Sequence, residues 1–361
     1  MAAFTRRPRG RISAAGARSG LAIAVVTSLT LASAACGDSS APPLATPKPR
    51  LSDEPCKQPG VAKYASAADL VAAMNHVWSY EPMPLDQRNH IAAATRSLEA
   101  ADLAAAARSA GQAGYAVTPV VIGERCAFTL APTATAPKGQ ATLVIATVYD
   151  RDLVIEAPHV PEDHRSDAEA ARLFDDVRAK VLIVAGAHRC ASPVPSGCHP
   201  NKACSGSHAS AESDVSHAVT SAFQAMHLAY RMTPSAMVQL HTNHSQTLNG
   251  DIQVSNGTAA VIPDTYADAF YAALHVPGVD VRGCNDPASP PPKGAFCGET
   301  NAQALASNGA EDACFGRASS AGGAAAHSFI HVEQSFTRMD DLASWEPIVA
   351  AALAAAVPIE R

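Results

Sequence analysis

Short apolar runs alternate with amphipathic segments over most of the chain after residue 140. The runs are β-branched and bounded by Gly or Pro, as strands are, whereas the amphipathic segments repeat apolar residues at helical spacing. The expected strands are 141–149, 153–158, 180–186, 236–241, 251–256 and 329–334, and the expected helices are 166–179, 214–232, 265–275 and 341–356. This alternation predicts an α/β fold with a mixed, mostly parallel sheet and helices on both faces.

The chain before residue 140 follows a different pattern. Residues 65–114 are alanine-rich and helical, and strand-like runs follow at 115–123 and 126–131. We therefore expect an N-terminal part of helices and strands over 61–140 and a larger α/β part over 141–361. Within the larger part, 282–326 is rich in Pro, Gly and Cys and has the character of an insertion.

The first 35 residues have the pattern of an export signal. They contain five arginines and no acid, followed by the apolar run LAIAVVTSLTLASAA. That run is too short for a permanent membrane span. Cys36, directly after Ser33-Ala34-Ala35, resembles the cleavage box of bacterial lipoproteins, which implies a lipid on Cys36. We expect a lipoprotein signal peptide over 1–35, a disordered tether over 36–60 and a protein anchored to the bacterial membrane, at the cell surface or in the periplasm; plain secretion is the alternative.

The net charge limits the classes of binding partner, and the cysteine content predicts disulfide bonds. Removing the signal lowers Lys plus Arg from 27 to 22 against 33 acids, which leaves a net charge of about −11. An acidic surface does not suit nucleic acid or anionic lipid, so we expect no nucleic-acid partner, membrane contact through the lipid alone, and a monomer. The eight cysteines other than Cys36 predict up to four disulfides, with Cys56 bonded to Cys126 and the others closing local loops.

Two expected strands end in histidine. His159 follows the strand 153–158, and His241 ends the strand 236–241. Parallel strands present their carboxyl ends at one edge of a sheet, so the two imidazoles are expected to meet there with a carboxylate. Glu162 is our first choice for that carboxylate, and Asp163 and Asp167 remain alternatives. Two histidines and one carboxylate form a catalytic zinc site with a position left for water.

Other polar residues follow apolar runs in the same way. Glu333 ends the strand 329–334, where a hydrolase needs a general base beside the metal. We expect a substrate-binding role for four further residues, with the Arg189 guanidinium suited to gripping a substrate carboxylate. These four are His188, Arg189, Asp214 and His217. Helix capping and salt bridging are the structural alternatives for these residues.

The segments APHVPE, QLHT and HVEQS, in that order, resemble the zinc carboxypeptidases and their relatives, the N-formylglutamate amidohydrolases and poly-γ-glutamate hydrolases. The resemblance covers residues 141–361 and implies a zinc-carboxypeptidase-like catalytic part. It also implies His159, Glu162 and His241 as zinc ligands and Glu333 as the base. One departure concerns Asn301: carboxypeptidases bind the substrate carboxylate with an Asn-Arg pair, and here Ala302 follows. Arg189, Arg282 or Arg317 would have to supply that clamp.

Three function classes follow from these observations. The leading hypothesis is a zinc-dependent amidohydrolase that acts on a peptide or an N-acyl amino acid. A non-catalytic binding lipoprotein with the same fold is the alternative. A serine hydrolase is disfavoured because the chain has no G-x-S-x-G motif.

Overall fold

The computed structural model describes residues 49–74, 76–199, 204, 210–231, 236–243, 250–286, 296–317 and 327–360. These residues belong to one compact unit, Lys48–Arg361. The predicted signal peptide and Cys36 lie outside the described residues. Within the described part, no helix combines the length and the apolar character that a membrane crossing requires.

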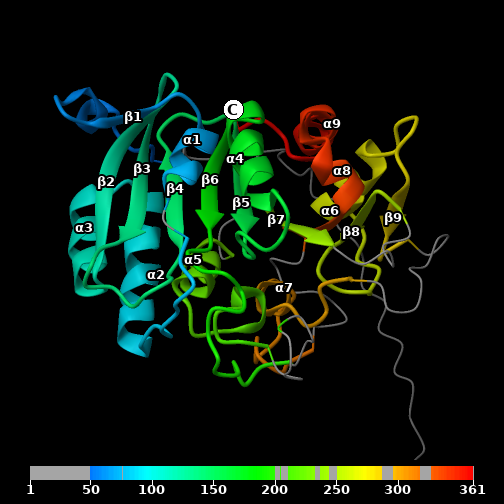
Figure 1. The fold of residues 1–361 in the computed structure, drawn as a ribbon. Helices are drawn as coiled ribbons and strands as arrows, with labels where there is room; N and C mark the ends of the chain where they lie inside the picture. The colour runs from blue at the N-terminus through cyan, green and yellow to red at the C-terminus, as the bar shows by residue number, and fades with distance from the viewer. Residues whose placement is uncertain are drawn as a thin grey trace, which may run out of the picture. The chain divides into compact units, whose positions relative to one another are not determined.

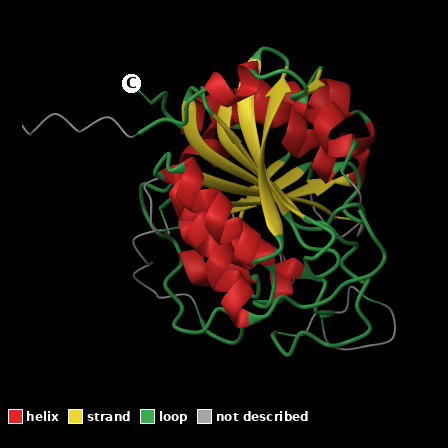
Figure 2. Cartoon of the chain, turned by 90° about the vertical axis from the view of Figure 1, so that its left-hand side faces the viewer, coloured by secondary structure: helices red, strands yellow, loops and turns green. Residues whose placement is uncertain are grey.

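One twisted sheet runs through the described part of the chain (Figures 1 and 2). Its ten strands lie in the order β1-β2-β3-β4-β6-β5-β7-β10-β8-β9. The bounds are β1 Ala62–Tyr64, β2 Tyr115–Ile122, β3 Arg125–Pro132, β4 Thr142–Ala146, β5 Arg151–Ala157, β6 Ala179–Val184, β7 Ala236–Asn243, β8 Ile252–Ser255, β9 Val281–Gly283 and β10 Phe329–Ser335. Five of the nine pairings among these strands are parallel, including the central run β6-β5-β7-β10. The predicted mixed, mostly parallel sheet is confirmed.

Helices cover both faces of the sheet, as predicted (Figure 2). The bounds are α1 Ala67–Ala72, α2 Leu85–Glu99, α3 Leu103–Gln112, α4 Ser166–Asp176, α5 Ala222–Tyr230, α6 Tyr266–Ala273, α7 Ala302–Ser307, α8 Phe336–Asp340 and α9 Leu342–Ala356, with 3₁₀ turns η1 Glu54–Lys57 and η2 Val215–His217. Apolar residues of α1, α4, α6, α8 and α9 join one core cluster, and those of α2, α3, α5 and α7 join the other.

The central strands alternate between these two cores. In β5, Leu153 and Ile155 belong to the core under α4, whereas Val154 belongs to the core under α5. Successive side chains of a strand point to opposite faces, so Glu156 shares the face of Val154. The register pairs Glu156 with Gln239 and His241 with Glu333. One face of the central sheet therefore carries a row of polar side chains at its carboxyl edge.

Two segments differ from the sequence expectation. The expected helix 214–232 begins only at Ala222, because Ser221 has extended backbone and its side chain accepts a hydrogen bond from the Gln224 amide, as an N-cap does. Asp214 and His217 therefore lie in the irregular segment before α5. Residues 51–57, expected in the tether, pack on the domain: Leu51 is buried and Cys56 is disulfide-bonded.

Four disulfides join the described cysteines. The predicted Cys56–Cys126 bond is present, and Cys190–Cys204 and Cys284–Cys297 close local loops. The expectation that the remaining bonds are all local is wrong for Cys198–Cys314, whose partners are 116 residues apart. This bond ties the loop after β6 to the loop after α7, two loops that the fold brings together at one edge of the sheet.

Candidate metal centre

Two histidines and an aspartate converge beyond the carboxyl ends of β5 and β7. The Nδ1 atoms of His159 and His241 lie 3.1 Å apart, and each lies 3.1 Å from Oδ2 of Asp163. All three residues are buried. The structure thus brings together His159 and His241, 82 residues apart, with one of the three acids considered from the sequence.

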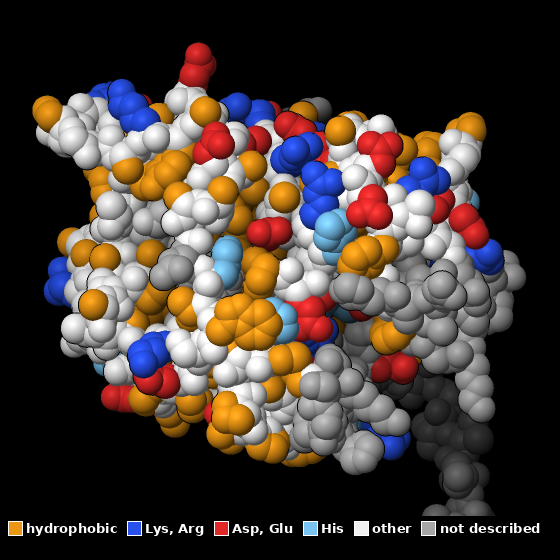
Figure 3. Space-filling model, viewed as in Figure 1, with side chains coloured by type: hydrophobic (Ala, Val, Ile, Leu, Met, Phe, Trp, Pro, Cys, Tyr) orange, Lys and Arg blue, Asp and Glu red, His pale blue; other side chains and the backbone are white. Residues whose placement is uncertain are grey.

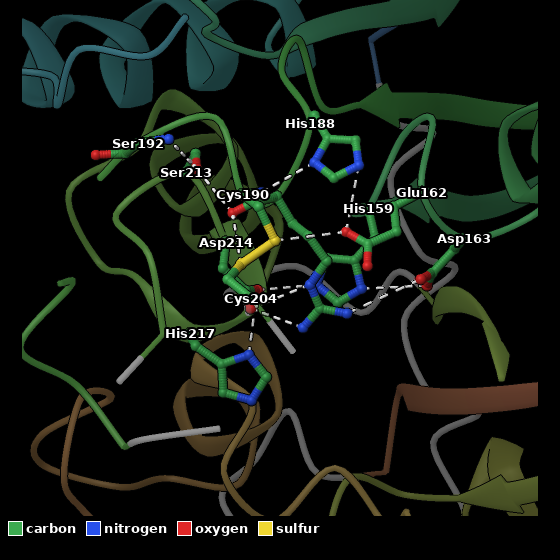
Figure 4. Close-up of a disulfide and its surroundings, with 11 residues drawn as sticks. His159, Glu162, Asp163, His188, Cys190, Ser192, Cys204, Ser213, Asp214 and His217 are labelled. Carbon is green, nitrogen blue, oxygen red and sulfur yellow. Dashed lines mark hydrogen bonds and ion pairs between the residues drawn. A yellow bond between two sulfur atoms is a disulfide. The ribbon is translucent and has the colours of Figure 1, made fainter. Parts of the chain in front are cut away.

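A tight turn decides which acid faces the histidines. The Asp163 amide donates to the His159 carbonyl at 2.8 Å, and the Ser166 amide donates to the Asp163 carbonyl at 3.0 Å. This turn carries the Asp163 side chain back over His159. Glu162, our first choice, points the other way, and its Oε2 lies 3.5 Å from His188 Nε2 (Figure 4). Asp167 lies in the first turn of α4 and belongs to none of the metal-compatible groups among the described residues.

The outward nitrogen of His159 has its own partner. His159 Nε2 lies 2.9 Å from Oδ1 of Asp214, which is fully buried (Figure 4). Arg189 donates to Oδ2 of the same carboxylate through Nη2 at 2.6 Å and through Nε at 3.2 Å. His217 Nδ1 lies 3.2 Å from Asp214 Oδ1. Three of the residues expected to bind substrate therefore contact one another on the far side of His159, where Asp214 orients the imidazole ring. These three are Asp214, Arg189 and His217.

The pKa values of the three converging residues differ in direction. Burial raises the pKa of Asp163, but His159 and His241 outweigh it and hold that pKa well below its usual range. Burial and Arg189 lower the pKa of His159, while Asp163 and Asp214 raise it, with a net rise to about 9. Burial lowers the pKa of His241 to about 4, so this ring stays neutral. Near neutral pH the site therefore holds the Asp163 carboxylate between a protonated His159 and a neutral His241, and a metal bound at His159 Nδ1 would displace the proton of that ring.

Glu333 lies on the neighbouring strand, opposite His241 in the β7–β10 register. Burial and the nearby Asp163 carboxylate raise its pKa, against the lowering effect of His159 and Arg189, to about 8. His331, two residues earlier on the same face, stacks at a tilt beside His241 with ring centroids 4.9 Å apart. Burial keeps the pKa of His331 well below its ordinary value. Near neutral pH, Glu333 is thus a mainly protonated acid beside the converging ligands.

Nearer the surface, His188 forms the rim of the group. Trp78 stacks on its ring at 4.0 Å between centroids and is 71% exposed. Acidic, histidine and hydrophobic side chains lie together near the centre of this face of the molecule (Figure 3). Two other arginines were considered for binding the substrate carboxylate. Arg282 lies on the edge strand β9 and forms an ion pair with Asp280, and Arg317 is exposed.

Three polar residues of this region were not predicted from the sequence. Glu156, Gln239 and His331 are buried and face the same side of the sheet as His241. Each occupies an alternate position of a run that we treated as uniformly apolar. The signal that would have found them is the two-residue spacing in QLH and HVE, since residues i and i+2 of a strand share a face.

The donor set fits a zinc ion. Zinc is bound by imidazole nitrogen and carboxylate oxygen at about 2.0–2.2 Å, so tetrahedral ligands lie about 3.3–3.6 Å from one another. The 3.1 Å separations among the three atoms are close to that value. Histidine ligands of metals usually donate their second nitrogen to a carboxylate or carbonyl group, as His159 does with Asp214. Two further groups of metal-compatible residues in the described part of the chain fit less well. In the group His159, Asp214 and His217, the carboxylate is already paired with Arg189, and in the group Glu162, His188 and Cys190, the cysteine is in a disulfide.

No family model and no curated protein matches this chain. Among solved structures, the N-formylglutamate amidohydrolase from Ralstonia eutropha JMP134 is 12% identical, with 60% of this chain and 96% of that chain covered and a TM-score of 0.35. A candidate metallopeptidase from Shewanella amazonensis SB2B is 14% identical, with 68% and 85% covered and a TM-score of 0.28. A candidate carboxypeptidase from Burkholderia mallei ATCC 23344 is 12% identical, with 67% and 74% covered and a TM-score of 0.31. With these TM-scores, the three structures superpose only loosely on this chain.

Proposed function

We propose that this chain is a zinc-dependent hydrolase that cleaves a peptide or N-acyl amino acid amide bond at the cell surface. The observation that carries the proposal is the convergence of His159 Nδ1, His241 Nδ1 and Asp163 Oδ2 at 3.1 Å from one another. Two imidazole nitrogens and one carboxylate oxygen make the three-residue ligand set of a catalytic zinc site, in which His159 would give up its proton to the solvent on binding the metal and water would take the fourth position. In this proposal Asp163 takes the role first expected of Glu162.

A bound zinc ion supplies Lewis acidity toward a carbonyl oxygen and a water molecule. Glu333 accepts the proton of the attacking water and returns it to the leaving amine. A group that first takes and then gives a proton works best when its pKa lies near the operating pH, and burial raises the pKa of Glu333 to about 8. Asp214, held by Arg189, keeps the His159 ring in place through its Nε2.

The substrate side of the site is the rim formed by Trp78 and His188. The exposed Trp78 ring offers an apolar surface to a peptide or an acyl group, and Glu162 adds a negative charge beside His188. A small peptide or amino-acid-derived molecule therefore remains our proposed substrate.

The proposed setting is the outer face of a bacterial membrane, with a lipid on Cys36 and the chain before residue 49 as the tether. The sequence pattern of residues 1–36 supports this part of the proposal. Mass spectrometry of the chain from a bacterial membrane fraction is expected to find a diacylglyceryl group on Cys36, and Cys36→Ser is expected to shift the protein into the soluble fraction. An unmodified N-terminus after Ala35 would mean plain secretion.

Metal analysis tests the enzymatic proposal. The purified mature chain is expected to contain about one zinc ion per molecule, and a chelator is expected to remove it together with hydrolysis of N-acyl amino acids and short peptides; zinc is expected to restore both. A chain that binds no zinc would contradict the proposal. A chain that binds zinc and hydrolyses none of these substrates would favour the non-catalytic binding lipoprotein.

A further inference from the structure

A buried chain of amides connects the start of helix α7 to the candidate ligand His241. It runs from Asn301 through Gln239 to the imidazole, and every member is buried. From this chain we infer that Asn301 and Gln239 are positioning residues that fix the tautomer of His241 and so decide which of its nitrogens faces the metal. The inference rests on the proposed metal site and adds the device that prepares one of its ligands.

The orientation of Asn301 follows from its role as a helix cap. Its Oδ1 accepts hydrogen bonds from the backbone amides of Gln303 at 2.9 Å and Ala304 at 3.0 Å. Only an oxygen can accept from these two donors, so the Nδ2 group must point the other way. There it donates to Oε1 of Gln239 at 2.5 Å.

Gln239 is oriented from both ends. Its Oε1 accepts from Asn301, and its Nε2 donates to Oε2 of Glu156 at 2.9 Å. Because Asn301 presents a donor, Gln239 must turn Oε1 toward Asn301 and Nε2 toward Glu156. Glu156 is held in turn, because His227 Nδ1 lies 2.9 Å from its Oε1. The amide of Gln239 therefore has one satisfied arrangement.

This arrangement determines the tautomer in which His241 would bind a metal. Its Nε2 lies 3.0 Å from Oε1 of Gln239, which is an acceptor, so Nε2 keeps its hydrogen when Nδ1 holds a metal. Nδ1 faces His159 and Asp163, the other two candidate ligands. Since a metal binds the unprotonated nitrogen, the amide chain presents His241 ready for coordination through Nδ1.

The substitution Asn301→Asp tests this inference because it preserves the cap and removes the donor. Asp is as good an N-cap as Asn, so α7 is expected to persist. Its second oxygen would face Oε1 of Gln239, and turning the Gln239 amide would only transfer that contact between oxygens to Oε2 of Glu156. In either case Gln239 loses the settled orientation that keeps Oε1 as the acceptor for His241 Nε2, which is expected to oppose metal binding through Nδ1.

The experiment compares zinc affinity by competition with a chromophoric chelator in wild type, Asn301→Asp and Asn285→Asp. Asn285 is a matched control because it is also buried and donates through Nδ2, to the Thr258 and Ala260 carbonyls, away from the metal site. Asn301→Asp is expected to weaken zinc binding about 10–100-fold, and Asn285→Asp to lower stability while leaving zinc affinity unchanged.

A second measurement reads the tautomer directly. In ¹⁵N-histidine spectra of the zinc-loaded full chain, His241 is expected to show zinc on Nδ1 and hydrogen on Nε2 in wild type, and to lose this pattern in Asn301→Asp. Unchanged zinc affinity and an unchanged tautomer in a folded Asn301→Asp variant would overturn the inference. Failure of the wild type to bind zinc would instead refute the proposed function, so the two failures are distinguishable.

Discussion

At the scale of single residues, the acidic ligand is selected by a backbone turn rather than by spacing. Glu162 and Asp163 are adjacent, and both are near enough to His159 in sequence. The hydrogen bond from the Asp163 amide to the His159 carbonyl folds the chain back, which leaves the two side chains on different sides. The sequence was sufficient to name both histidines and a short set of acids. It did not contain a signal for this turn, so the choice within the set required the structure.

Asp163→Asn and Glu162→Gln separate the two acids. Asp163→Asn removes the negative ligand between His159 and His241 and is expected to weaken zinc binding by at least about 100-fold. Glu162→Gln removes the charge of a neighbour that contacts His188 and is expected to leave zinc affinity within about threefold. Isothermal titration with zinc measures both. The reverse order of effects would return Glu162 to the ligand set.

Glu333→Gln tests the proposed base. The change keeps the shape of the side chain and removes its ability to take a proton, so we expect kcat to fall about 10²–10⁴-fold while zinc content is unchanged. Glu346→Gln is the control, since Glu346 is a buried glutamate of α9 on the opposite face of the sheet. Steady-state kinetics on the zinc-loaded proteins gives the comparison. Full activity in Glu333→Gln would remove Glu333 from the mechanism.

At the scale of elements, the apolar character of short runs predicted the strands, but it gave no indication of the polar residues within them. The run FIHVEQS gives β10, yet His331 and Glu333 alternate with Ile330, Val332 and Gln334. Strand prediction depends on average apolarity, which these alternating positions barely lower. The false helix start before Ala222 has a related origin: Asp214 and Ser221 are both good caps, but the Asp214 carboxylate is engaged by His159 and Arg189, and Ser221 caps the helix.

A buried acid between α4 and β10 predicts how stability depends on pH. Burial raises the pKa of Glu169 to about 8, against the opposing effect of a hydrogen bond from Gln334. The folded state thus binds a proton that the unfolded state releases near pH 4.5, so stability is expected to fall as pH rises from about 5 to about 8. Glu169→Gln keeps an acceptor for Gln334 and has no charge to bury. Urea unfolding at several pH values should show a loss about 1–3 kcal/mol smaller in this variant than in wild type.

At the scale of the whole molecule, a single sheet joins the two parts that the sequence appeared to separate. The strands β1 to β3 of the N-terminal part continue directly into β4 and the parallel centre. The fold class followed from the order of strands and helices. The connection did not, because strand order depends on contacts between residues far apart in the chain. The same holds for Cys198–Cys314, whose partners have no recognisable spacing.

The disulfide that closes a long loop is expected to contribute more to stability than one that closes a short loop. In the chain-entropy description, a bond that closes a longer loop restricts the unfolded chain more. Cys198–Cys314 spans 116 residues and Cys284–Cys297 spans 13. Replacing both cysteines of a pair by serine is therefore expected to cost about 5 kcal/mol of unfolding free energy for the long pair and about 3 kcal/mol for the short one. Urea unfolding of the two double variants under oxidising conditions measures the difference. Equal losses would show that native-state contacts around the bonds, rather than the length of chain they restrict, set their contribution.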